Sequence, residues 1–126
     1  MVKLIPYIHR ETGESGRRFL NTIQENFGDV VIELCDDLDA LEKVAQVTDL
    51  PGHGKKIFIL YVDSETRLTQ LYEHVDMFDG ERVIALIPEN KKTFLIRVNR
   101  FYPRFTGMID GSFLDVIAVL QKMIQQ

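Results

Sequence analysis

Hydroxyl and glycine residues gather in the stretch HRETGESGRR, His9 to Arg18, which follows a short apolar run. In such a loop a glycine lets the backbone approach a phosphate, while hydroxyl groups and the amides of a following helix donate hydrogen bonds to it. The stretch is therefore a candidate anion site. Its candidate binding residues are Thr12, Gly13, Ser15 and Gly16.

Two glutamates count against this site. Glu11 and Glu14 put negative charge where a phosphate would sit, and no P-loop string occurs in the chain. The alternative is a flexible turn in which Arg17 and Arg18 are solvated. We therefore expect no bound cofactor, and keep the loop as a second hypothesis.

A basic, aromatic segment, NKKTFLIRVNRFYPRF, is the other concentration of functional side chains. It stands out because the whole chain carries 15 Lys and Arg against 19 Asp and Glu, a formal charge of -4. Arginine and large aromatic residues are enriched at interface hot spots. The segment predicts a surface for a protein partner or for self-association, formed by Arg97, Arg100, Phe101, Tyr102 and Arg104. In the alternative interpretation, the aromatic residues are a buried stripe and the cations its solvated side.

Other catalytic patterns are absent from the sequence. The three histidines are dispersed, so no metal site is expected, and no nucleophile elbow or Ser-His-Asp order occurs. Cys35 is the only cysteine and lies in the apolar run VVIELC, which predicts a buried, inert thiol and excludes an intrachain disulfide. These features predict a protein that is not an enzyme.

Short apolar runs alternate with amphipathic segments along the chain. The runs are rich in β-branched residues, as strands covered on both faces should be. They predict five strands, at Val2 to Ile8, Val30 to Cys35, Ile57 to Val62, Val83 to Ile87 and Thr106 to Ile109. Between and after them, apolar residues recur at helical spacing, for example at Phe19, Ile23 and Phe27, and at Leu68, Leu71, Val75 and Phe78.

This alternation predicts the fold class. Parallel strands joined by right-handed crossovers form a three-layer αβα sandwich, and the commonest order for five strands is the flavodoxin-like 2-1-3-4-5. Length and composition fit one domain over residues 1–126. Ligands of such folds bind beyond the carboxyl ends of strands 1 and 3.

Charge and hydropathy limit the partners and the compartment. The negative net charge argues against a general binder of nucleic acid or of anionic membranes, because both need a positive field. No apolar run approaches the roughly 20 residues of a membrane span, and the N-terminus lacks a signal-peptide pattern. We therefore expect a cytoplasmic protein.

Three stretches resemble the receiver domain of response regulators. VVIELCDDLDALEKVAQ is similar to that family's second strand and helix, IFILYVD to the third strand with its phosphoacceptor aspartate, and FTGMIDGSFLDVIAVLQKMI to the fifth strand and last helix. The resemblance implies a flavodoxin-like fold and places Asp63 at the acceptor position. It also implies partner contacts through the region from the fourth to the fifth helix. Separately, ETGES resembles the phosphate loop of flavodoxins, and this resemblance implies a module that binds a flavin or nucleotide phosphate through the Thr12–Gly16 loop.

The family's other functional residues are missing from this sequence. Tyr7, Ile8 and His9 stand where the resemblance implies a metal-binding acidic pair, and Pro88 and Asp110 stand where it implies a hydroxyl and a lysine. Without a cation, nothing offsets repulsion between Asp63 and a phosphoryl group. We therefore expect a non-catalytic, receiver-like signalling or regulatory domain that acts through protein contacts.

Two acidic stretches have a simpler interpretation. Asp63 with Ser64, and the group Asp36, Asp37 and Asp39, lie where helices should begin, and acidic or hydroxyl side chains stabilise helix N-termini. An atypical phosphoacceptor at Asp63 remains a third hypothesis.

Overall fold

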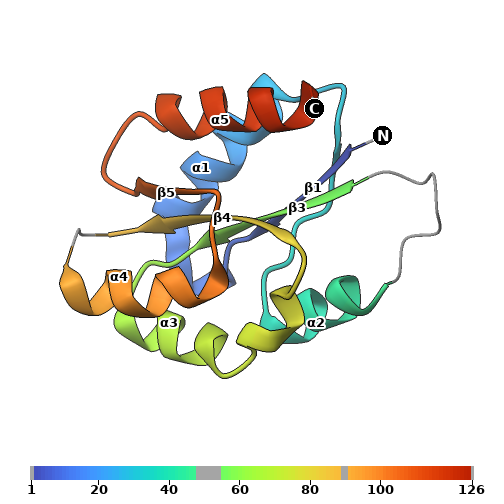
Figure 1. Ribbon diagram of the computed structural model, residues 1–126. Coiled ribbons are helices and arrows are strands. Elements are labelled where there is room, and N and C mark those ends of the chain that lie inside the picture. The colour runs from blue at the N-terminus through green and yellow to red at the C-terminus, as the bar shows by residue number, and fades with distance from the viewer. Residues whose placement is uncertain (1, 48–54, 89–90, 126) are drawn as a thin grey trace.

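One parallel sheet organises the chain, and the computed structural model describes residues 2–47, 55–88 and 91–125. The strand order is β2-β1-β3-β4-β5, which confirms the predicted order 2-1-3-4-5 (Figure 1). The strands are β1 (Val2–Tyr7), β2 (Val31–Ile32), β3 (Lys55–Tyr61), β4 (Arg82–Ile87) and β5 (Phe105–Met108).

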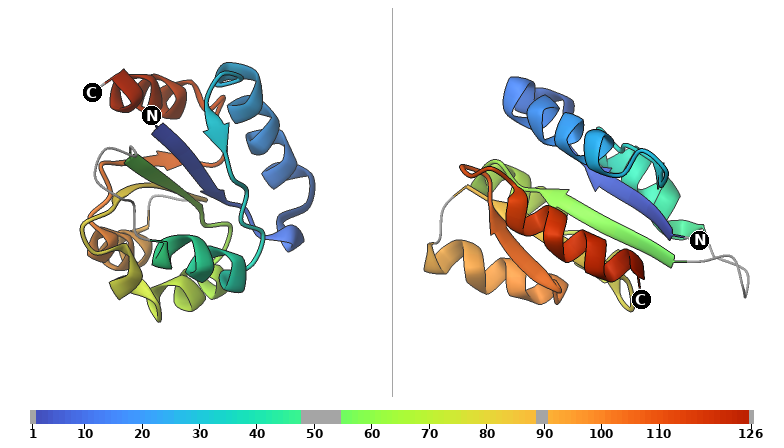
Figure 2. Two further views of the ribbon diagram at one scale, coloured as in Figure 1. Left: turned by 90° about the vertical axis from the view of Figure 1, so that its right-hand side faces the viewer. Right: turned by 90° about the horizontal axis from the view of Figure 1, so that it is seen from above.

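Helices cover both faces of the sheet, as the two further views in Figure 2 also show. One face carries α1 (Gly13–Asn26) and α5 (Leu114–Gln125), and the other carries α2 (Leu38–Gln46), α3 (Glu65–Tyr72) and α4 (Lys92–Val98). Three short 3₁₀ segments complete the described part: η1 (Arg10–Thr12), η2 (Val75–Phe78) and η3 (Asn99–Phe101). The structure is the predicted αβα sandwich.

The sheet divides the hydrophobic core into two halves. Alternate residues of β3 point to opposite faces, so that Phe58 and Leu60 pack toward α2, α3 and α4, while Ile59 and Tyr61 pack toward α1 and α5. Because both faces are buried, strands β3 and β4 are almost continuously apolar. This is the physical reason why runs of apolar residues identified the strands.

The second strand is shorter than predicted. The chain from Val31 to Cys35 follows β1, but only Val31 and Ile32 form a regular ladder, with an isolated bridge at Cys35. Leu4 O and Pro6 O accept from Glu33 and Cys35, and Pro6 has no N–H to complete the alternation. Pro6 therefore interrupts this ladder, and its missing donor faces the edge strand.

Helix starts follow the polar residues expected to cap them. Asp37 Oδ1 accepts from Ala40 N at 2.8 Å at the start of α2, and Ser64 Oγ accepts from Arg67 N at 3.2 Å at the start of α3. The stripe from Leu68 to Phe78, however, does not form one helix. It is divided between α3 and η2, and His74 N donates to Leu71 O in a tighter turn.

Cys35 is 1% exposed, as predicted. Burial, together with the nearby acidic residues Glu33, Asp36 and Asp37, raises the pKa of its thiol to about 11. The thiol is therefore protonated at neutral pH, which fits the prediction of an unreactive side chain. Within the described ranges, no helix is long and apolar enough to cross a membrane.

Candidate functional site

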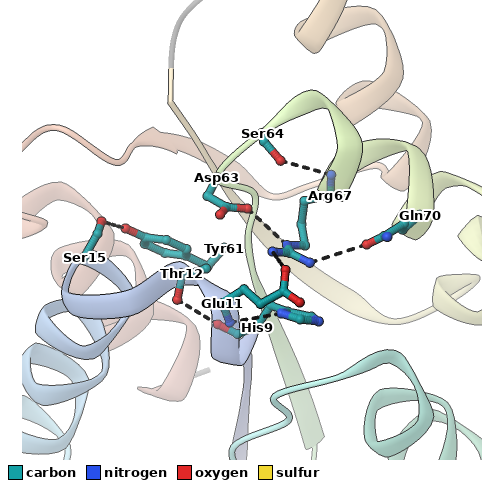
Figure 3. Close-up of polar contacts among 9 residues, drawn as sticks. All are labelled: His9, Glu11, Thr12, Ser15, Tyr61, Asp63, Ser64, Arg67 and Gln70. Carbon is teal, nitrogen blue, oxygen red and sulfur yellow. Dashed lines mark hydrogen bonds and ion pairs between the residues drawn. The ribbon is translucent and has the colours of Figure 1, made fainter.

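Arg67 is the centre of the polar cluster at the carboxyl ends of β1 and β3 (Figure 3). Its side chain is 8% exposed. Nε donates to Asp63 Oδ1 at 3.1 Å, Nη1 donates to Gln70 Oε1 at 3.4 Å, and Nη2 lies 3.9 Å from Glu11 Oε2. The guanidinium thus joins the residues that follow β3 to the segment that follows β1.

The position of Arg67 explains why it needs these partners. It lies in the first turn of α3, where the helix dipole disfavours a positive charge. A buried cation is also costly unless it is paired and hydrogen-bonded. Asp63 and, more loosely, Glu11 supply the compensating charge.

The sequence analysis missed Arg67. The available signal was its spacing from Asp63, because residues at i and i+4 are neighbours on a helix surface. The resemblance to receiver domains concerns Asp63 alone and says nothing of a partner for its carboxylate. In the structure Asp63 is one member of an ion pair, and its side chain is 29% exposed.

The predicted phosphate loop is the beginning of a helix. Thr12 occupies the N-cap position of α1 without a side-chain capping bond, and residues 13–16 form the first helical turn, so the turn expected over these residues is helical instead. Both hydroxyl groups have internal partners: Thr12 Oγ1 donates to His9 O at 2.8 Å, and Ser15 Oγ shares a hydrogen bond with the Tyr61 hydroxyl (Figure 3). An anion would have to displace these bonds to use the hydroxyl donors.

The two glycines of this turn have different roles. Gly13 has φ +67°, a left-handed conformation that favours glycine, and nothing lies within 4 Å of the position its Cβ would take. Gly16 is buried, and a Cβ there would overlap Thr12 Oγ1 and lie 2.6 Å from Ile8 Cγ2. Gly16 is therefore explained by close packing of α1 against the end of β1.

The segment after β1 is also tied to α2. Arg10 Nη2 lies 2.6 Å from Asp37 Oδ2 and 3.6 Å from Asp36 Oδ1. His9 Nδ1 accepts from Glu11 N at 3.1 Å and so caps η1. The acidic pair after β2 thus has capping and ion-pairing roles.

Two fully buried tyrosines lie on opposite faces of the sheet near this edge. Tyr61 shares its hydroxyl with Ser15, whereas the Tyr7 hydroxyl makes no hydrogen bond of ordinary geometry and has the Arg67 guanidinium nearby. Burial raises the pKa of both phenols, and Arg67 partly offsets this for Tyr7. Both side chains therefore remain neutral over the physiological range.

This difference gives a matched pair of substitutions. Tyr7→Phe should leave the free energy of unfolding unchanged or raise it by up to about 1 kcal/mol, because it removes an unpaired buried hydroxyl. Tyr61→Phe should lower it by roughly 1 kcal/mol, because Ser15 loses its partner. Urea unfolding of both variants measures the contrast, and a larger loss in Tyr7→Phe would contradict it.

The predicted contact residues divide into exposed and buried members. Arg97, Arg100, Tyr102 and Arg104 are exposed. Phe101 is 4% exposed and packs against Phe78, with ring centroids 5.5 Å apart, as the alternative interpretation of the segment expected. The exposed residues run from α4 through η3 to the start of β5.

The structure also places the dispersed histidines. His9 caps η1, His74 Nδ1 lies 3.1 Å from Glu42 Oε1, and His53 falls outside the described residues. Among residues 2–47, 55–88 and 91–125, no group of three or more His, Cys, Asp or Glu could hold a metal ion. Asp63 is paired with a guanidinium rather than placed beside other carboxylates.

The sheet order and helices define an α/β protein with the flavodoxin-like arrangement. Comparisons with models of protein families, with curated proteins and with solved structures found no significant match.

Proposed function

We propose that this chain is a non-catalytic, receiver-like regulatory domain that acts in the cytoplasm through protein contacts. The contact surface in this proposal is the exposed basic, aromatic region made by Arg97, Arg100, Tyr102 and Arg104. Arg67 supports the non-catalytic part, because its guanidinium is hydrogen-bonded to Asp63, the carboxylate that would have to accept a phosphoryl group. The resemblance to receiver domains supports the regulatory part.

The conformation of Tyr102 is the observation that carries the proposal. Tyr102 ends η3 with φ 51° and ψ 52°, a left-handed position usually taken by glycine or asparagine. Its side chain is nevertheless large and aromatic, and the residue is 81% exposed. Tyr102 therefore stabilises neither the turn nor the core. It lies in the chain between the exposed Arg100 and Arg104, and is well suited to anchor a partner.

Tyr102→Gly separates folding from binding. The substitution should raise the free energy of unfolding by up to about 1 kcal/mol, because glycine adopts this conformation without strain. It should also abolish capture of a partner from an extract of the source cells. Arg100→Glu should lose the same partner, and Arg17→Glu, an equal charge change at an exposed position on α1, should retain it.

A phosphorylation assay tests the non-catalytic part. Incubation with acetyl phosphate and Mg²⁺ followed by intact-mass measurement should give no phosphoryl adduct. An adduct that disappears in Asp63→Asn would overturn this part and support the phosphoacceptor hypothesis. Partner capture that is equal in Tyr102→Gly, Arg100→Glu and the unmodified chain would overturn the contact surface.

A further inference from the structure

A groove of about 360 Å³ lies between α3 and α4. Its lining includes the buried side chains of Leu68 and Phe94 and the 60% exposed Ile96. Glu65, Thr93 and Arg97 complete the lining with polar groups. The groove therefore combines an apolar lining with polar groups, and its volume is within the usual range of binding pockets.

Cations flank the apolar part of this groove along α4. Lys92, Ile96 and Arg100 are spaced by four residues and form one row on the exposed side of α4 and η3. Thr93 and Arg97 form the adjacent row, closer to α3, because Arg97 Nη1 donates to Thr69 Oγ1 at 2.7 Å. Ile96 thus has a cation one turn before it and another one turn after it.

Arg97 is held in place at the boundary between the two helices. Besides its hydrogen bond to Thr69, its guanidinium carbon lies 5.8 Å from the centroid of the Tyr72 ring. A guanidinium has five N–H donors, so the bond to Thr69 leaves donors for a carboxylate. A cation that is already positioned loses less conformational entropy when it binds.

The charge distribution in the sequence selects an acidic partner. Residues 91–104 contain five Lys and Arg and no Asp or Glu, and the other 112 residues contain the remaining 10 cations and all 19 acids. Glu65 places a carboxylate on the α3 side of the groove, so an acidic segment is attracted to the α4 side and repelled by most of the remaining surface. Apolar side chains on the same segment match the exposed Ile96 and the apolar base of the groove.

We propose that the α3–α4 groove binds an acidic amphipathic helix of a partner protein. One apolar face of that helix packs on the exposed Ile96, above the groove base that Leu68 and Phe94 form, and its flanking carboxylates pair with Lys92, Arg97 and Arg100. This inference rests on the proposed function, since it specifies the chemistry of the partner. It extends the contact surface from η3 and β5 to the groove beside α3.

A designed peptide tests the groove directly. The probe is a fluorescein-labelled amphipathic helix of about 15 residues, with leucines at i, i+4 and i+7 and glutamates on both flanks. Fluorescence anisotropy with the full chain should show saturable binding that weakens as salt is added. Arg100→Glu and Ile96→Asp should each weaken binding roughly tenfold, and Arg17→Glu less than about twofold. Both test positions are exposed, and circular dichroism checks that the variants fold.

Four results would overturn the proposal. The first is that Arg100→Glu or Ile96→Asp binds the probe as tightly as the unmodified chain does, and the second is that a probe with alanines in place of the leucines binds equally well. The third is that a single-stranded oligonucleotide of equal charge binds at least as tightly as the probe. The fourth is that the chain forms a dimer that dissociates in Ile96→Asp. If the probe fails but partner capture still depends on Arg100 and Tyr102, only the groove is overturned. A phosphoryl adduct on Asp63 overturns the non-catalytic function whatever the probe does.

Discussion

Asp63→Asn is expected to lower the free energy of unfolding by roughly 2 kcal/mol, because it leaves the buried Arg67 guanidinium without its closest counter-charge. A fully buried pair would cost more, but Asp63 keeps 29% of its side chain exposed and solvent screens part of the loss. Arg67→Met should cost a similar amount, about 2 kcal/mol, through the loss of its hydrogen bonds. Urea unfolding at neutral pH measures both effects.

The double variant shows whether the two residues act as a pair. Asp63→Asn with Arg67→Met should cost less than the sum of the single variants by at least about 1 kcal/mol, because no buried charge is then left alone. Glu11→Gln is the control: Glu11 is 75% exposed at 3.9 Å from Arg67, so its effect should stay within about 0.5 kcal/mol. If the losses of the two single variants simply added up in the double variant, Asp63 and Arg67 would not stabilise the fold as a pair.

Gly16→Ala is expected to lower the free energy of unfolding by about 1–3 kcal/mol. An alanine Cβ would overlap Thr12 Oγ1 and lie 2.6 Å from Ile8 Cγ2, so the start of α1 would have to move away from β1. The sign of the result is informative. In an open helix, replacing glycine with alanine would instead stabilise the protein by roughly 0.5–1 kcal/mol.

Gly111→Ala is the matched control for Gly16. Nothing lies within 4 Å of its added Cβ, and the expected change is within about 0.5 kcal/mol. Thermal or urea unfolding of the two variants gives the comparison. Equal stability of Gly16→Ala and the unmodified chain would mean that Gly16 is not required for packing, and would restore the idea that it was selected for a bound anion.

The architecture could be predicted from local patterns. Short apolar runs rich in β-branched residues became β3 and β4 because both faces of a covered parallel sheet are buried, and the spacing of Phe19 and Ile23 placed α1 against it. Strict alternation of strands and helices then left few topologies. The short length of β2 could also have been predicted, because Pro6 has no backbone N–H to donate to a neighbouring strand.

The polar site was less predictable because hydrogen-bond partners come from distant positions. The sequence identified Thr12 and Ser15 as hydroxyl donors, but it could not show that His9 and Tyr61 use them. It placed Asp63 at the end of a strand, but the neutralising Arg67 passed unnoticed. Similarly, Phe101 and Tyr102 are adjacent aromatic residues, and only backbone conformation separates the buried one from the exposed one.

Periodicity and charge are properties of the chain, so the order of the elements, the burial of both faces of the sheet and the concentration of cations in residues 91–104 could be predicted without the fold. Tertiary structure decided which polar groups are free to meet a ligand. It joined Asp63 to Arg67 and Ser15 to Tyr61, and it left Tyr102 and Ile96 exposed. The physical reason is that a side chain's availability depends on what the fold brings within hydrogen-bonding distance, and sequence spacing shows this only for near neighbours.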